Sequence, residues 1–309
     1  MEIDMAIHDA KLVSDAEMSS TMAKLDKIER MSKQPAKPFR RKAALKAAAK
    51  ARRVTGAKPV TPAAPRIQLP AALPEPWLRL EEIALEAPGG KTASLPLVNR
   101  FRGAPATRAF DVLRTRLLQT LKARGWRRVA VAAPTRGCGA TFTAVNLALS
   151  LARVPDSRTV LMDLNLREPG VAKALGRAPS GDMRGFLKGN LRVTDHLLRC
   201  GQSLALGLSD RPAVDAAELL QAPVCAGVLD AMILDMNPDV VLYDLPAMLA
   251  HDDLSGFLPQ IDGVLLVADG TRTTAAHIRA CERVLGEDVP LLGVALNRAR
   301  GSDNEAFAV

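Results

Sequence analysis

One stretch, residues 127–153, constrains the fold of this chain more than any other: RRVAVAAPTRGCGATFTAVNLALSLAR. It begins with an apolar run from Val129 to Ala133 and turns through a glycine-containing segment from Thr135 to Gly139. Apolar residues at helical spacing follow. A strand, a glycine turn and a helix in this order predict a loop that binds phosphate. Glycines let backbone N–H groups turn inward, and the N-terminus of the helix adds partial positive charge.

The loop departs from the usual phosphate-binding pattern at Ala140. That pattern ends in Gly, Lys and Ser or Thr, and its lysine reaches the terminal phosphates of a nucleotide. Here the three residues are Gly139, Ala140 and Thr141, so the spacing, the last glycine and the hydroxyl are kept and the lysine is absent. The sequence therefore predicts a P-loop fold with a damaged or altered nucleotide site.

Apolar strands alternate with helical patterns after this loop, and most strands end at a polar residue. Strands are expected at 159–162, 203–208, 240–243, 264–268 and 291–296, and helices at 105–124, 182–199 (mostly helical), 216–236 (interrupted near Pro223) and 274–285. This alternation predicts an α/β, doubly wound, mostly parallel sheet of the P-loop NTPase fold. Ligands of such sheets bind at the carboxyl ends of the strands, where Asp163, Asp244 and Asn297 fall.

Composition divides the chain into four segments. Residues 1–32 are expected to form one amphipathic helix, 33–90 a flexible basic Ala/Lys/Pro-rich linker, 91–300 the P-loop domain and 301–309 a tail. The helix is either a marginal one that forms only when docked or a partner-binding element. Residues 76–100 are expected to be an ordered lead-in, in which Trp77, Leu78, Leu80, Ile83 and Leu85 cover part of the domain.

The positive charge of the chain belongs to one segment. Twelve Lys and Arg residues lie between Arg30 and Arg66 without an acid, and they exceed the formal net charge of +9. Residues 30–66 are either a solvated tether or a contact to an anionic membrane or acidic partner, worth up to about 1 kcal/mol per basic residue near an anionic surface. Phe39 is the one aromatic residue among the basic ones, and this scarcity argues against nucleic acid.

Several classes of protein are excluded by simpler features. No apolar run reaches the roughly 18 residues of a membrane span, and the N-terminus lacks the order of a secretory signal. The four cysteines are scattered, which argues against a zinc site or disulfide framework and fits a reducing cytoplasm. The four histidines are also scattered, so they do not indicate a metal cluster.

Phosphoryl transfer depends mainly on neutralising charge, and this chain has candidates for that task. Residues 137–141 supply N–H groups, and the Thr141 hydroxyl is placed to bind magnesium. Asp244 follows the apolar VVLY and fits the aspartate that holds magnesium or its water, while Asp163 follows VLM as a second acid. We therefore predict Asp163 and Asp244 as catalytic residues and, with Thr141, as metal ligands.

Taken together, five motifs resemble one family. The pieces GCGAT, VLMDLNLREP, PDVVLYDLP, IDGVLLVADGTRT and GVALNR follow the order and spacing of the bacterial tyrosine kinases of capsule and exopolysaccharide assembly (the CpsD/CapB type). These belong to the MinD/ParA branch of P-loop proteins. The lead-in AFDVLRTRL and the AELL at 217–220 are also similar, and the resemblance covers about residues 95–300.

The resemblance implies a cytoplasmic domain, peripheral to the inner membrane, that binds ATP and Mg²⁺ and pairs with a membrane-embedded polysaccharide co-polymerase controlling chain length. It also implies self-association through the helix at 105–124. The expected nucleotide-binding residues are Thr135, Arg136, Gly137, Cys138, Gly139, Ala140, Thr141, Phe142 and Asn297, the last at a position near the adenine.

The chain departs from this family in three further ways. Asn165 replaces a second acid that would serve as general base, and an amide cannot accept a tyrosine proton. The tail at 301–309 lacks the family's tyrosine cluster, and the one tyrosine, Tyr243, lies in an apolar run. The family's E-x2-R-x2-R helix is matched by Arg108, Asp111 and Arg114, so the first two charges are reversed.

Three functional hypotheses follow. The first is an impaired relative of these kinases that regulates or scaffolds exopolysaccharide production. The second is an active ATPase or kinase in which Arg136 or Arg167 replaces the lysine; both are otherwise ordinary surface arginines. The third is a MinD/ParA-like positioning protein whose basic segment contacts membrane or DNA.

Overall fold

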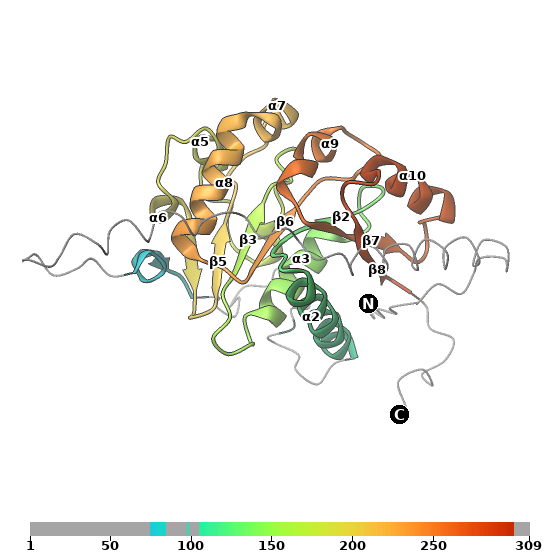
Figure 1. Ribbon diagram of the computed structural model, residues 1–309, viewed down its shortest axis with the longest axis horizontal. Coiled ribbons are helices and arrows are strands. Elements are labelled where there is room, and N and C mark those ends of the chain that lie inside the picture. The colour runs from blue at the N-terminus through green and yellow to red at the C-terminus, as the bar shows by residue number, and fades with distance from the viewer. Residues whose placement is uncertain (1–74, 85–97, 99–104, 300–309) are drawn as a thin grey trace, which may run out of the picture. The chain divides into compact units, whose positions relative to one another are not determined.

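The computed structural model describes residues 75–84, 98 and 105–299 (Figure 1). The predictions for the helix at 1–32, the basic segment at 30–66 and the tail at 301–309 lie outside the described residues, as does Leu85.

An eight-stranded sheet forms the centre of the domain, in the order β1-β4-β5-β3-β6-β2-β7-β8. The strands are β1 (Glu81–Glu82), β2 (Arg128–Ala132), β3 (Thr159–Asp163), β4 (Leu198–Cys200), β5 (Leu204–Gly207), β6 (Val240–Asp244), β7 (Gly263–Asp269) and β8 (Leu291–Asn297). Pairing is parallel from β5 through β8, and β4 is antiparallel to β5. The predicted doubly wound, mostly parallel sheet is confirmed.

Helices cover both faces of this sheet (Figure 1). One face carries α2 (Pro105–Arg124), α3 (Ala140–Leu151) and α4 (Val171–Ala174); the other carries α5 (Met183–Leu187), α6 (Val193–His196), α7 (Ala216–Gln221), α8 (Pro223–Met236), α9 (Asp253–Phe257) and α10 (Ala275–Leu285). Two hydrophobic cores result, one on each side. Because β3, β6 and β7 are buried on both faces, they consist of the continuous apolar runs seen in the sequence.

The prediction of a mostly helical segment over 182–199 is partly wrong. Helix α5 ends before Gly189, whose φ of +77° is the left-handed conformation that stops a helix. After α6, Leu198 to Cys200 pair with β5 as strand β4. Pairing to a neighbouring strand, which a local pattern does not contain, therefore overrides the helical tendency of this segment.

The lead-in at 76–84 belongs to the folded domain, although the linker was predicted to extend to residue 90. A short 3-10 helix, η1 (Pro76–Arg79), precedes β1 and buries Trp77. The Trp77 Nε1 donates to the carbonyl of Gln202 at 3.0 Å, and the Arg158 guanidinium lies 5.1 Å above its ring. Arg158 also holds Glu75 through two hydrogen bonds of 2.5 and 2.9 Å.

The boundary was misplaced because three side chains, Trp77, Leu80 and Ile83, are the buried apolar groups of the described lead-in at 75–84, and a pattern of three positions is too short to mark where a domain begins. Leu78, which was expected to help cover the domain, points outward and is 54% exposed.

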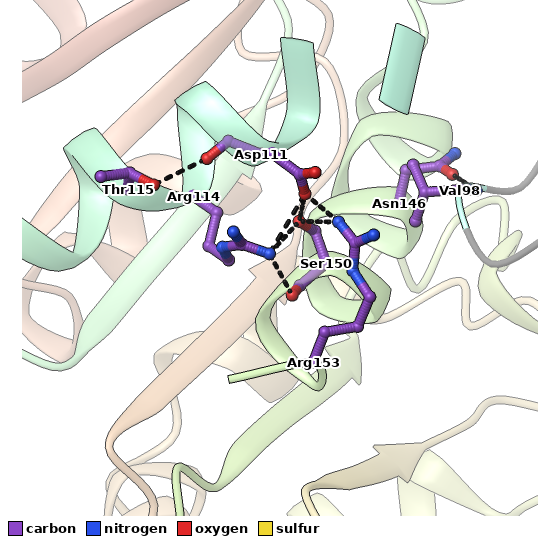
Figure 2. Close-up of polar contacts among 7 residues, drawn as sticks. All are labelled: Val98, Asp111, Arg114, Thr115, Asn146, Ser150 and Arg153. Atoms are coloured by element: carbon purple, nitrogen blue, oxygen red, sulfur yellow. Dashed lines mark hydrogen bonds and ion pairs between the residues drawn. The ribbon is translucent and has the colours of Figure 1, made fainter. Parts of the chain in front are cut away.

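Helix α2 packs against α3 through a polar network centred on Asp111 (Figure 2). The Asp111 carboxylate accepts from Arg114 at 3.1 Å and from Ser150 at 2.9 Å, and it is paired with Arg153. Arg114 also donates to the Ser150 carbonyl at 3.1 Å, near the C-terminus of α3, where a positive charge is favourable. Two of the three charges that the resemblance assigns to self-association, Asp111 and Arg114, therefore make contacts within the chain here.

None of the helices in residues 75–84 and 105–299 combines the length and the apolar character needed to cross a membrane.

We predict that Trp77→Ala lowers the free energy of unfolding by about 3–5 kcal/mol, because it removes a fully buried ring together with its hydrogen bond. Leu78→Ala, one residue away and exposed, is the matched control and is expected to change stability by no more than about 0.5 kcal/mol. Urea unfolding of the two variants measures both values. Equal small effects would show that this lead-in does not stabilise the domain.

Candidate functional site

The loop between β2 and α3 has the backbone shape of an anion-binding turn. Gly137 has a φ of +80° and Gly139 a φ of +98°, values that favour glycine, and Gly139 lies directly before the first turn of α3. A Cβ atom on Gly139 would lie 2.2 Å from the Asn297 Nδ2 atom. Glycine at position 139 is thus required both by conformation and by the close approach of Asn297.

The segment after β8 fixes this loop from the side. Asn297, which is 5% exposed, donates from Nδ2 to the Cys138 carbonyl at 2.8 Å, and Arg298 donates to the Gly137 carbonyl at 2.9 Å. Arg298 is held in turn by the buried Asp269 at 2.7 Å. Asn297 therefore orients the loop; its proximity to an adenine remains a prediction.

Asp163 and Asp244 lie side by side at the carboxyl ends of β3 and β6, where they are partners in the sheet register. Both are fully buried. Asp163 accepts from the backbone N–H groups of Gly170 and Val171 through one oxygen, at 3.0 Å each. Its other oxygen and both oxygens of Asp244 have no hydrogen bond within the described residues.

Burial makes these two carboxyl groups difficult to ionise. It raises the pKa of Asp163 from 3.8 to about 7, and the N–H groups of Val171 and Gly170 oppose that rise. Burial raises the pKa of Asp244 well above its usual value, and the Asp163 carboxylate raises it further. The nearby Thr141 hydroxyl opposes the second shift, without making a hydrogen bond of standard geometry.

The three unpartnered carboxylate oxygens are what a hard cation would satisfy. Mg²⁺ is commonly held by one or two carboxylates and completes its shell with water and substrate phosphates. Within residues 75–84 and 105–299, no group of three His, Cys, Asp or Glu side chains is arranged to hold a metal alone. Thr141, Asp163 and Asp244 thus fit a magnesium ion that arrives with a phosphate ligand, and their metal-binding role remains a prediction.

A cavity of about 470 Å³ opens over the loop and the start of α3. Eight of the nine predicted nucleotide-binding residues line it: Thr135, Arg136, Gly137, Cys138, Gly139, Ala140, Thr141 and Phe142. Asn297 does not, because it lies beneath the loop. Asp163 and Asp244 are also outside the lining, since they are buried below Thr141 and the turn at Gly170.

The two arginines considered as replacements for the lysine are already paired. Arg136 forms an ion pair with Glu168 across the cavity edge. Arg167 makes two hydrogen bonds, of 2.7 and 2.8 Å, to the fully buried Asp253. Removing Arg167 from Asp253 would leave a buried charge uncompensated, so this arginine is poorly suited to follow a ligand.

Sequence reasoning missed several residues that line the cavity: Glu168, Gly170, Lys173, His251 and Arg298. Arg298 could have been found, because it follows Asn297 directly at a strand end. The others lie on loops or on the four-residue helix α4, where no periodic pattern marks a residue as facing a ligand.

The comparisons with known proteins agree with this geometry. No family model matches the chain. The chain is 28% identical to EpsB of Ralstonia solanacearum, described as a tyrosine-protein kinase, over 206 residues, which is 65% of the chain. It is also 28% identical to the succinoglycan biosynthesis transport protein ExoP of Rhizobium meliloti over 231 residues, which is 72% of the chain. The VpsO kinase domain superposes with a TM-score of 0.55 at 26% identity, covering 65% of this chain and 98% of that one.

The resemblance to the bacterial tyrosine kinases is confirmed. The aligned part of the chain spans about a quarter of the length of the curated relatives, 27% of each. The similarity to bacterial tyrosine kinases therefore concerns the P-loop domain, which VpsO shares almost in full.

We predict that Gly139→Ala destabilises the domain by about 1–3 kcal/mol and weakens phosphate binding, because the new methyl group displaces Asn297 from the loop. The matched control is Gly227→Ala in α8, where a Cβ meets nothing within 4 Å and a helical glycine is replaced. That change is expected to stabilise by about 0.5–1 kcal/mol. Thermal unfolding of both variants measures the contrast, and equal shifts would contradict it.

The raised pKa values also predict a dependence of stability on pH. The folded chain holds the Asp163 proton up to about pH 7 and the unfolded chain releases it near pH 4, so stability falls as pH rises between these values. Asp244→Asn removes one of the two charges and is expected to flatten this fall. At pH 8 the variant is expected to be more stable than the wild-type chain, because the buried pair then carries one negative charge fewer.

Asp235→Asn, at an exposed position on α8, is the control for this experiment and is expected to follow the wild-type profile. Urea unfolding between pH 4 and pH 8 gives the three curves. A wild-type stability that rises over this range would contradict the assigned pKa shifts.

Proposed function

We propose that this chain is a nucleotide-binding, tyrosine-kinase-like domain that regulates exopolysaccharide production and does not phosphorylate itself on tyrosine. One observation carries the second half of the proposal. The single tyrosine of the chain, Tyr243, is fully buried in the central strand β6 and packs edge-to-face on Phe257, with ring centroids 5.2 Å apart. Its hydroxyl is out of reach of any active site in the folded domain.

The residues around the loop support impaired phosphoryl transfer. Ala140 contributes a methyl group at the position from which a lysine would contact the terminal phosphates. Asn165 lines the same cavity and has no group that can accept a proton from a substrate hydroxyl. The positive charge and the base that transfer requires are therefore both absent from their usual positions.

The same site retains what binding requires. The loop keeps its inward-turning backbone, and the helix α3 begins directly behind it. The unpartnered oxygens of Asp163 and Asp244 favour a bound cation, and Mg²⁺ in that position would offset the negative charge of the nucleotide phosphates. Because binding and turnover depend on different residues, a domain of this kind can bind a nucleotide and respond to it without hydrolysing it.

The names of the relatives support the biological setting of the proposal. Since ExoP is a succinoglycan biosynthesis transport protein, we place this chain in a cytoplasmic assembly at the inner membrane, beside a membrane-embedded co-polymerase that controls polysaccharide chain length. Self-association through α2 is the less supported part, because Asp111 and Arg114 are bound within the chain. An assembly through α2 would have to rearrange these contacts.

We predict that Ala140→Lys tightens binding of ATP with Mg²⁺ by roughly 10- to 150-fold, the effect of about 1.5–3 kcal/mol expected from one charged hydrogen bond. Ala140→Met, which adds a similar length without charge, is the control and should give no such gain. Isothermal titration calorimetry measures both. An absence of ATP binding by the wild-type chain would overturn the proposal that it senses nucleotide.

Turnover is tested separately. The wild-type chain is expected to show no phosphotyrosine after incubation with ATP and Mg²⁺, and ATP hydrolysis far below the 1–100 per second typical of kinases. Phosphotyrosine on the folded chain, or hydrolysis in that range, would contradict the regulatory role and favour an active kinase with rearranged cations.

A further inference from the structure

A phosphate-binding loop without its lysine needs another positive group if it is to hold the terminal phosphates of a nucleotide firmly. Four Lys or Arg residues line the cavity over the loop: Arg136, Arg167, Lys173 and Arg298. Three of them are paired with carboxylates: Arg136 with Glu168, Arg167 with Asp253, and Arg298 with Asp269. Among the described residues, Lys173 is the cavity-lining cation that makes no ion pair.

The position of Lys173 is fixed by the same contacts that build the acidic centre. Helix α4 starts at Val171, and the N–H groups of Gly170 and Val171 hold the Asp163 carboxylate at 3.0 Å. Gly170 also lies against Thr141, since a Cβ on Gly170 would be 3.1 Å from the Thr141 Cγ2 atom. The first turn of α4 is thereby anchored to the start of α3, beside Ala140.

Within α4, Lys173 is the residue that faces outward. Val171, Ala172 and Ala174 are buried in the core, whereas Lys173 is exposed and lines the cavity together with Ala140 and Thr141. Contacts of the neighbouring Gly170 and Val171 place its backbone, and no ion pair among the described residues holds its side chain. An ammonium group on a flexible four-carbon stem, with three donors, can follow a phosphate that a locked guanidinium cannot reach.

We infer that Lys173 supplies, from α4, the positive charge that Ala140 no longer supplies from the loop, and that it contacts the terminal phosphates of a bound nucleoside triphosphate. This rests on the proposed binding of nucleotide at the loop. The inference predicts that Lys173 affects the binding of ATP and ADP more than that of AMP. Its ammonium group would contact the β- and γ-phosphates, and not the α-phosphate.

The test is calorimetric titration of the full chain with ATP, ADP and AMP in the presence of Mg²⁺. Lys173→Met keeps the length of the side chain and removes its charge, and it is expected to weaken ATP binding at least tenfold and to leave AMP binding within twofold. Lys173→Arg keeps the charge and should retain most of the ATP affinity. Lys122→Ala, an exposed lysine on α2 away from the cavity, is the control and should match wild type.

The double variant Lys173→Met, Ala140→Lys tests whether a lysine at position 140 can replace the positive charge of Lys173 in ATP binding. Restoring the lysine to the loop is expected to recover at least the wild-type ATP affinity. Because Lys173 is exposed, the single variant should keep the wild-type melting temperature, which separates lost binding from lost folding.

The outcomes distinguish the inference from the function on which it rests. ATP binding by the wild-type chain that Lys173→Met leaves unchanged, or weakens equally for ATP and AMP, overturns the role of Lys173 and leaves nucleotide binding intact. Failure of the wild-type chain to bind any of the three nucleotides overturns both. A tenfold loss confined to ATP and ADP, recovered in the double variant, establishes the inference.

Discussion

The pairing of β3 with β6 places two carboxyl groups next to each other in the interior, and much of the site follows from this constraint. Asp163 and Asp244 are partners in the strand register, and both are fully buried. One carboxyl oxygen of Asp163 and both of Asp244 have no hydrogen-bond partner within the described residues. Two carboxyl groups this close together in the interior cannot both be ionised without a cation. The fold thus holds two mutually repelling carboxyl groups below the loop, and we propose that a cation bound together with a phosphate ligand neutralises them.

The rest of the site holds this arrangement in position. Asn297 and Arg298 fix the loop through the carbonyls of Cys138 and Gly137, so the loop keeps its shape although the lysine is missing. The turn at Gly170 closes over Thr141 and Asp163 and leads into α4. The contacts that shape the loop therefore do not require a lysine at position 140, which supports the proposal that the domain binds nucleotide without turning it over.

The sequence was sufficient to predict the sheet, the helix α2 with its bounds and the position of the loop, because long apolar runs and a clear helical period determine these locally. It was also sufficient to place Asp163 and Asp244 at strand ends. It could not predict that Arg167 is committed to Asp253, or that Lys173 faces the cavity, since both depend on which loops the sheet order brings together. Strand β4 was missed for the same reason, whereas the burial of Trp77 against the domain was predicted.

The measurement that tests the central claim most directly is the melting temperature of the full chain at pH 8 with Mg²⁺ alone, ATP alone and both together. Binding to the folded state alone raises the melting temperature in proportion to the logarithm of ligand concentration. The account predicts a clear rise only when Mg²⁺ and ATP are present together, and a smaller rise in Asp244→Asn, which lacks the charge to be neutralised. An unchanged melting temperature with both ligands, or an equal rise in that variant, would contradict it.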